Sequence, residues 1–454
     1  MTVLWADHAL TAEGWAEAVR IDIGSDGRIA SLETGAAPAG TRLGLLLPAP
    51  ANSHSHTFQR AMAGLTEARG EDPTDSFWTW RRLMYRFLDR ITPDQVQAIA
   101  ALVQMEMLEA GYATNVEFHY LHHQPDGAPY DRLSEMAERI AAAQAVSGIG
   151  LTLLPVHYEH GGCDGRPLGA GQRRFGNDFD RFARLVDETR KLLDVLPKDA
   201  RLGVAPHSLR AVPPGDLANV SMLVPDGPIH MHLAEQRAEV DEVLAARGAR
   251  PVEWALDNLP LDDRWCLIHC TQMTPQETTG LARTGAVAGL CPITEASLGD
   301  GIFDGVRWLD TGGRISVGSD SNILISLHEE LRALDTSQRL RDHTRAALAS
   351  SEHSTGRRLF GAVAQGGAQA AGRGRGALAT GEWADILALD TGHIDLAGLT
   401  GDRLLDTFVF AGRDAMVSDV WAAGRHMVQD GRHIHRETIT RAYTEAVSSL
   451  RSGL

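Results

Sequence analysis

The middle of the chain alternates short apolar runs with segments whose apolar spacing follows the helical period. Each run ends in polar residues, and apolar strands alternating with helices are typical of a parallel sheet that is buried on both faces. The runs lie at residues 44–47, 113–118, 150–156, 201–205, 228–233, 265–269, 285–290 and 314–317. Eight such units predict an α/β protein built as a (β/α)8 TIM-like barrel.

Helical periodicity is clearest in four of the segments between the runs. These segments are residues 93–110, 131–146, 236–246 and 327–346. A Gly- and Ala-rich stretch at residues 361–376 is expected to be a tight helix that leads out of the barrel.

Both chain ends show a different pattern, in which turns rather than helices separate short β segments. At the N-terminal end this pattern covers residues 3–47. Near the C-terminal end we expect strands at residues 382–389, 406–410 and 417–428. We predict that the two ends form one small β-sandwich from residues 1–48 and 375–435, beside a barrel of residues 49–374 and a C-terminal helix of residues 436–454.

Composition excludes several classes of partner. The formal net charge of −16 argues against binding to nucleic acid or to an anionic membrane surface, because both require a basic surface. Four cysteines in 454 residues are too few for a disulfide framework. The sequence shows no secretory signal and no apolar stretch of membrane-spanning length. We therefore expect a cytoplasmic protein with reduced thiols, and a small molecule as its ligand.

Two histidines follow the first predicted strand at alternating positions. Residues two apart in an extended segment point to the same side, so His54 and His56 can reach one metal ion. A His-x-His pair alone is weak evidence, because surface and packing histidines show the same spacing. The ends of the other strands decide the interpretation.

Further strand ends supply residues of the same kind. They are His232 and Glu235 after strand five, His269 on strand six and Asp320 after strand eight. The active site of a (β/α)8 barrel lies on the face where its strands end, so these side chains are expected to meet at one rim. His-rich ligation with one carboxylate suits a catalytic divalent ion, with Zn²⁺ as the first choice. Spacing alone does not separate the metal ligands from the acid–base groups.

This set of strand ends resembles the amidohydrolase superfamily. Its signature is His-x-His after strand one, His after strands five and six, and Asp after strand eight. Residues 205–208 at the end of strand four contain no Lys, which disfavours the two-metal subtype with a carboxylated lysine. The resemblance covers essentially the whole chain and implies a site for one divalent metal ion.

Several longer motifs lie in the barrel loops. They are HTFQRAMAG at residues 56–64, DSFWTWR at 75–81, EFHY at 117–120, HSLR at 207–210, AEQ at 234–236 and TEASLGDG at 294–301. Together they resemble the formimidoylglutamate deiminases of histidine breakdown. One departure is Pro-Ala-Pro-Ala-Asn at residues 48–52, where relatives have Pro-Gly first and Pro just before Asn. The departure leaves the predicted ligands intact.

The resemblance implies a metal ion held by His54, His56, His232 and Asp320. It also implies hydrolysis of N-formimino-L-glutamate to N-formyl-L-glutamate and ammonia, with Glu235 protonating the imine nitrogen. His269 is expected to polarise or deprotonate at the reacting centre, and Asp320 to assist proton transfer while it binds the ion. An alternative role for Glu235 is to cap the helix that follows it.

A glutamate-derived substrate is a dianion, and burying its carboxylates requires cationic or hydrogen-bonding partners. Arg offers a planar fork that suits a carboxylate. Arg210 follows strand four, and Arg81 lies in the long connection after strand one, where it is equally consistent with a solvated helix charge. We expect Gln59, Tyr120 and His207 to complete the grip on the substrate.

Five further histidines gather near strands two and three, and for them we favour hydrogen-bonded structural roles over function. They are His119, His122, His123, His157 and His160.

Two alternatives remain for the function. The nearer one is another mononuclear-metal aminohydrolase, acting on a purine, a pterin or an S-adenosylhomocysteine-like amine, although the two arginines disfavour a neutral ring. The other is a barrel that has lost catalysis and serves as a scaffold, which the complete set of ligands and acid–base groups disfavours. The family resemblance also suggests a homodimer.

Overall fold

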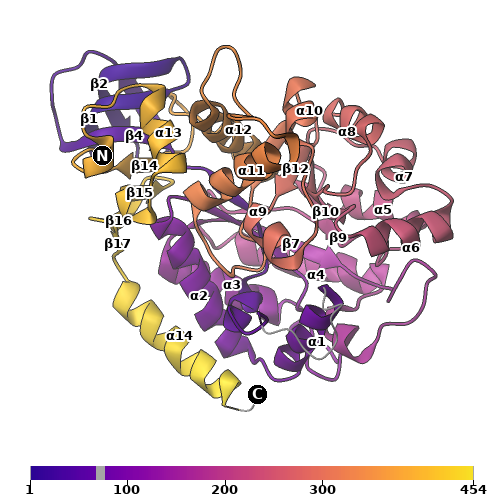
Figure 1. Ribbon diagram of the computed structural model, residues 1–454. Coiled ribbons are helices and arrows are strands. Elements are labelled where there is room, and N and C mark those ends of the chain that lie inside the picture. The colour runs from indigo at the N-terminus through magenta and orange to yellow at the C-terminus, as the bar shows by residue number, and fades with distance from the viewer. Residues whose placement is uncertain (1, 68–76, 453–454) are drawn as a thin grey trace.

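The structure is a computed structural model that describes residues 2–67 and 77–452, without the side chains of residues 77–79 and 82. The central part of the chain forms a barrel, and both chain ends contribute to a smaller sheet beside it (Figure 1).

Parallel strands follow one another around the barrel in chain order. Single bridges between Val204 and Ile229 and between Ser55 and Asp320 close the circle. The strands are β5 (Ala51–Ser55), β6 (Thr114–His119), β7 (Gly150–His157), β8 (Arg201–Leu202) with β9 (Ala205–Pro206), β10 (Ile229–Leu233), β11 (Trp265–His269), β12 (Val287–Leu290) and β13 (Arg314–Val317). The predicted (β/α)8 barrel is confirmed, with its fourth strand split into β8 and β9.

Helices connect the strands and cover the outside of the barrel (Figure 1). Their ends follow local chemistry: Thr92 and Gln95 form a capping box at the start of α2, and Gly148 ends α3 in a left-handed conformation with φ 70°. The helices are α1 (Phe77–Leu88), α2 (Pro93–Glu109), α3 (Glu135–Ser147), α4 (Phe179–Leu193), α5 (Pro214–Met222), α6 (Arg237–Arg247), α7 (Pro251–Asn258), α8 (Pro275–Ala282), α9 (Pro292–Leu298), α10 (Gly305–Asp310), α11 (Leu327–Asp342) and α12 (Thr355–Ala370).

Strands from both chain ends form one sheet in the order β17-β16-β15-β14-β4-β1-β2-β3. The two ends join where β4 pairs antiparallel with β14. The sheet has its own apolar core, which includes Leu4, Ile21 and Trp421. Its strands are β1 (Thr2–Thr11), β2 (Gly14–Ile23), β3 (Ile29–Glu33), β4 (Thr41–Pro48), β14 (Ile386–Leu389), β15 (Val417–Ala422), β16 (Arg425–Gln429) and β17 (Arg432–His433). A small β domain built from both ends is confirmed, while its limits at residues 48 and 375 stay predictions.

Two of the expected strands are wrong. Residues 44–47 belong to β4 of the small sheet, and the first barrel strand is β5. Leu45 and Leu47 face the main core while Leu46 faces the core of the small sheet, so β4 is buried on both faces like a barrel strand. Residues 406–410 lie in helix α13 (Asp402–Phe410). Five residues span less than two helical turns, which is too short for the helical period to be recognised.

The chain ends in α14 (Arg436–Arg451), as expected, and this helix packs against α2. Within residues 2–67 and 77–452, no helix is both long and apolar enough to cross a membrane.

Candidate metal centre and active site

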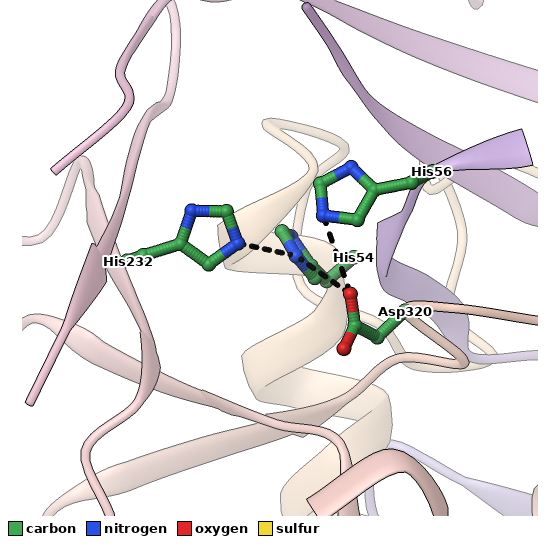
Figure 2. Close-up of side chains that lie close together, drawn as sticks. All are labelled: His54, His56, His232 and Asp320. Atoms are coloured by element: carbon green, nitrogen blue, oxygen red, sulfur yellow. Dashed lines mark hydrogen bonds and ion pairs between the residues drawn. The ribbon is translucent and has the colours of Figure 1, made fainter. Parts of the chain in front are cut away.

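Four side chains from three parts of the barrel face one another at the carboxyl ends of its strands (Figure 2). Nε2 of His54 lies 3.1 Å from Nε2 of His232 and 3.4 Å from Oδ1 of Asp320. Nε2 of His56 lies 3.2 Å from the same carboxylate oxygen. The structure thus brings together all four residues that the sequence suggested as metal ligands, with their ligand atoms within 4.8 Å of one another.

Hydrogen bonds to backbone carbonyls orient two of the imidazoles. Nδ1 of His56 lies 3.1 Å from the carbonyl oxygen of Phe118, and Nδ1 of His232 lies 3.2 Å from that of His207. A carbonyl oxygen only accepts, so Nδ1 of each ring carries the proton and the lone pair of Nε2 is free. Both lone pairs point toward the centre of the group, as metal ligation requires.

The charge states of the four groups also fit a bound cation. Burial lowers the pKa of His54 to about 3 and lowers the pKa of His56 and His232 as well. Burial alone would raise the pKa of Asp320, but its hydrogen bond with His54 and the neighbouring imidazoles lower it. Neutral imidazoles and an ionised carboxylate are the forms that bind a metal ion.

A buried polar network fastens the two strands that carry three of these side chains. Asn52 on β5 donates to Oγ of Ser319 at 2.7 Å and accepts from its backbone N–H at 3.1 Å. Oγ of Ser319 donates to Asn322 at 2.6 Å, and Asn322 donates to Oγ of Ser55 at 3.2 Å. All four side chains are buried. This seam between β5 and β13 fixes the spacing of His54, His56 and Asp320.

A second support holds the turn after His56. Glu117 on β6 accepts hydrogen bonds from the backbone N–H and the hydroxyl of Thr57, both at 2.9 Å. Burial raises the pKa of Glu117 to about 7, although these donors oppose the rise. Glu117 therefore positions the start of the short helix of residues Thr57–Met62, which carries Gln59.

The two predicted acid–base residues lie beside the metal ligands. Nε2 of His269 is 3.8 Å from Oε1 of Glu235, and Nδ1 is 3.2 Å from Oε1 of Glu295. Burial disfavours a charge on His269, but Glu235, Glu295 and Asp320 outweigh it and raise its pKa to about 10. Burial raises the pKa of Glu235, while His269 and Arg210 oppose the rise. Glu235 and His269 thus lie close enough for each to shift the pKa of the other.

Left-handed backbone conformations concentrate at the same strand ends. The φ angles are 53° at Ala234, 72° at His269, 47° at Asp320 and 56° at Asn322. Such conformations are uncommon for residues other than glycine and gather where function demands a particular side-chain direction. They turn the strand ends so that Glu235, His269 and Asp320 face one cavity.

The metal-binding residues His56 and His232 also line that cavity. All five residues expected to bind the substrate line it, together with Glu235, His269 and Asp320. They are Gln59, Arg81, Tyr120, His207 and Arg210.

Arg210 is a buried cation of the cavity lining. Burial alone would lower its pKa, but the charges of Glu239 and Glu235 raise it, while its buried Nε lacks a hydrogen-bond partner among the described residues. Nη2 of Arg81 donates to the hydroxyl of Tyr158 at 3.1 Å. Burial, together with the charges of Arg210 and Arg81, keeps the pKa of His207 well below its usual value. The cavity lining therefore combines a metal-binding group with a cationic group, which we call the metal end and the cationic end.

Two residues of the site were missed from the sequence. Tyr158 lines the cavity, holds Arg81 and accepts from Gln172 at 2.7 Å. Tyr158 directly follows β7, and site residues of a (β/α)8 barrel lie at the carboxyl ends of its strands, so its position in the sequence is a signal that could have found it. Glu295 holds His269 and lies within a motif whose individual roles were not assigned. By contrast, His230 on β10 points away from the site, because alternation sends its Nε2 to the carbonyl of Ala370 at 2.8 Å.

The barrel and its His- and Asp-lined rim define a metal-dependent hydrolase. The family model described as "Amidohydrolase family" matches residues 45–427, and the one described as "Formimidoylglutamate deiminase HutF, N-terminal domain" matches residues 1–42. A formimidoylglutamate deiminase from Pseudomonas aeruginosa is 47% identical over 99% of this chain and 100% of its own length. The chain therefore belongs to the amidohydrolase family and, within it, to the formimidoylglutamate deiminases.

Other relatives agree with this placement. The crystal structure of an amidohydrolase from Brucella melitensis has a TM-score of 0.95 and 49% sequence identity, covering 99% of this chain and 100% of that one. A 5-methylthioadenosine/S-adenosylhomocysteine deaminase from Natronomonas pharaonis is 25% identical, covering 85% of this chain and 82% of its own. The resemblance noted from the sequence is confirmed, and the adenosine-type deaminases are more distant.

Proposed function

We propose that this protein hydrolyses N-formimino-L-glutamate to N-formyl-L-glutamate and ammonia, in the degradation of histidine. The observation that carries the proposal is one cavity lined both by the metal-binding residues His56, His232 and Asp320 and by the cations Arg81 and Arg210. A molecule with an amidine at one end and carboxylates at the other matches this arrangement. The 47% identity to the Pseudomonas aeruginosa enzyme supports the same substrate.

The metal ion is proposed to be a single divalent cation, with Zn²⁺ as the first choice. Three neutral imidazoles and one carboxylate suit Zn²⁺, and the oriented Nε2 atoms of His56 and His232 support this donor set. His54 and Asp320 complete it. When bound, such an ion supplies the positive charge that makes water nucleophilic near neutral pH.

The protein's own groups are proposed to move the protons. Water adds to the amidine carbon, and Glu235 protonates the imine nitrogen so that it can leave as ammonia. His269 polarises the reacting centre, and Glu295 holds its ring from the other side at 3.2 Å. Asp320 accepts a proton from the attacking water and passes it to the same nitrogen, which thereby gains its second proton. The carbon–nitrogen bond then breaks with release of ammonia, and the hydroxyl proton returns to Glu235 as the carbonyl of the formyl group forms.

The cationic end is proposed to hold the two carboxylates of the substrate. Arg210 offers a buried guanidinium that lacks a protein carboxylate, and Arg81 approaches from α1. Gln59 donates to the hydroxyl of Tyr120 at 2.9 Å, and this pair forms one wall. His207 forms the floor between the two ends. Charge-assisted hydrogen bonds of this kind fix both position and orientation.

We also propose a homodimer in the cytoplasm. Sedimentation of the purified protein as a monomer at all concentrations would contradict the dimer, and recovery from a membrane or secreted fraction would contradict the location.

The deciding experiment is an assay of ammonia release by zinc-loaded protein. N-formimino-L-glutamate is expected to be turned over, while metal-stripped protein and a panel of purine and pterin amines yield nothing. N-formimino-L-aspartate, one methylene shorter, tests the distance between the two ends. Release from adenosine-type amines alone would favour the aminohydrolases that include the Natronomonas pharaonis relative, and would overturn the substrate.

A further inference from the structure

A second group of potential ligands lies on the outside of the barrel, away from the active-site cavity. Its members are His157 at the end of β7, Glu159 two residues later and Asp216 in the first turn of α5. Their ligand atoms all lie within 4.8 Å of one another. Nε2 of His157 is 3.4 Å from Oε2 of Glu159.

The central histidine is buried without a hydrogen-bond partner. The side chain of His157 has 0% exposure, and neither of its ring nitrogens forms a hydrogen bond to another described residue. Its neighbours on the other side are the rings of Phe179 and Phe182. The histidines beside it differ, since His122 and His123 bond to backbone carbonyls. His122 and His123 thus make hydrogen bonds of the kind expected from the sequence, whereas both ring nitrogens of His157 lack one among the described residues.

The two carboxylates are also uncompensated. Oε2 of Glu159 is buried without a hydrogen-bond donor, and among the described residues neither Glu159 nor Asp216 has an Arg or Lys within 4.0 Å. Burial lowers the pKa of His157 to about 4, so its imidazole is neutral at pH 7. Burial and the charges of Asp216 and Asp178 raise the pKa of Glu159, so its ionised form is disfavoured here, and a bound divalent cation would stabilise that form.

We propose that His157, Glu159 and Asp216 bind a second divalent cation, with water completing its coordination. Mixed imidazole and carboxylate ligands suit Zn²⁺ and Mn²⁺. The cation turns unsatisfied buried polar atoms into ligands, which removes the free-energy cost of leaving them without partners.

Such an ion would brace two segments that line the substrate cavity. Tyr158 lies between two of the ligands, and the backbone N–H of Glu159 donates to the carbonyl of Ala211 at 2.9 Å. Ala211 follows Arg210, and α5 begins three residues later with Asp216 in its first turn. The ion therefore ties the loop of Tyr158 to the segment of Arg210 from behind. It has a structural role and takes no part in proton transfer.

Metal counting tests the proposal without using turnover. Full-length protein is stripped with a chelator, reloaded with excess Zn²⁺, desalted and analysed by plasma mass spectrometry. We expect two ions per chain in the natural protein and one in the double variant Glu159→Gln/Asp216→Asn, which keeps side-chain size. The matched control His160→Gln, on the same loop, is expected to keep two.

A further variant separates the two sites. His54→Ala/Asp320→Asn removes two active-site ligands and is expected to keep one ion, lost only when Glu159→Gln/Asp216→Asn is added. One ion in the natural protein, or equal counts in the natural protein, the double variant and the control, would overturn the proposal. Circular dichroism of each variant checks that the barrel is folded. The result is independent of which amine the active site hydrolyses.

Discussion

At the metal end of the cavity the side chains are already held by the protein, whereas at the cationic end Arg210 still lacks an anionic partner. His56 and His232 are fixed by carbonyl oxygens, and Asn52 and Ser319 lock the seam beneath Asp320. Arg210 has a buried nitrogen without an acceptor among the described residues.

The two groups differ in whether the protein itself satisfies their hydrogen bonds or leaves that to a ligand. Ligands that are oriented in advance bind an ion without a further loss of side-chain entropy. A buried cation that lacks a partner instead favours whatever brings the missing carboxylate, because that ligand restores its hydrogen bonds. One end therefore provides reactivity and the other provides selectivity for an acidic substrate.

Removal of the metal ion tests the metal end and is expected to have the largest effect on activity. Treatment with a chelator is expected to abolish ammonia release, because the bound ion supplies the positive charge that makes water nucleophilic. Addition of Zn²⁺ should restore it. Unchanged circular dichroism of the stripped protein is the control, and full turnover without any bound metal would contradict the assignment of the four ligands.

Glu235→Gln separates proton transfer from metal binding. The variant keeps the shape of the side chain but cannot release a proton, so kcat is expected to fall by about 10²–10⁴-fold. Metal content, measured by plasma mass spectrometry, should stay unchanged. If the metal ion is lost as well, Glu235 is a ligand rather than the acid.

Arg210→Met tests the cationic end. Loss of a hydrogen bond to a charged group costs about 1.5–3 kcal/mol, so KM is expected to rise by about 10- to 100-fold, with a smaller change in kcat. Arg190→Met on the outer helix α4 is the matched control, since its Nη2 reaches only the carbonyl of Leu223 on the surface. An unchanged KM would remove Arg210 from the substrate site.

Asn52→Ala breaks the seam. It leaves the buried backbone N–H of Ser319 without an acceptor, so the free energy of unfolding should fall by about 1–3 kcal/mol. The midpoint of urea unfolding measures the loss. Asn258→Ala, which removes an exposed hydrogen bond at the end of α7, is the control and should have little effect. Equal midpoints in the two variants would contradict the role of the seam.

Tyr120→Phe is expected to have the smallest effect. It removes the hydroxyl that accepts from Gln59 at 2.9 Å, a neutral hydrogen bond that contributes about 0.5–1.5 kcal/mol. KM should rise by about 2- to 10-fold, with metal content unchanged. A fall in kcat as large as that of Glu235→Gln would place Tyr120 among the reacting groups instead.

The sequence predicts which side chains line the site better than it predicts the contacts that hold them in place. Period-two spacing and strand order place His54, His56 and Asp320 on one rim, because parallel strands end at one face. The seam partners of Asn52 are not predictable in the same way, since 267 residues separate it from Ser319. Their contact follows only from closure of the barrel.

The local hydrophobic pattern also misleads where a strand is buried on both faces, because apolar and polar residues then no longer alternate along it. Leu45, Leu46 and Leu47 form a continuous apolar run because β4 lies between two cores, and this run looks like a barrel strand. The sequence around His157 does not reveal that its ring lacks a hydrogen-bond partner. Nor does it reveal that Asp216 on α5, which is distant in sequence, lies beside it.

Closure at the seam has a consequence for the order in which the protein is made. A ribosome produces roughly 5–20 residues per second, so the stretch between Asn52 and Ser319 takes roughly 13–50 s to follow the first strand. During that time His54 and His56 have emerged without Asp320, and β4 waits still longer for β14. A nascent or truncated chain without Asp320 therefore has no complete active-site metal centre, and the ability to hold the active-site ion reports that synthesis has passed the last barrel strand.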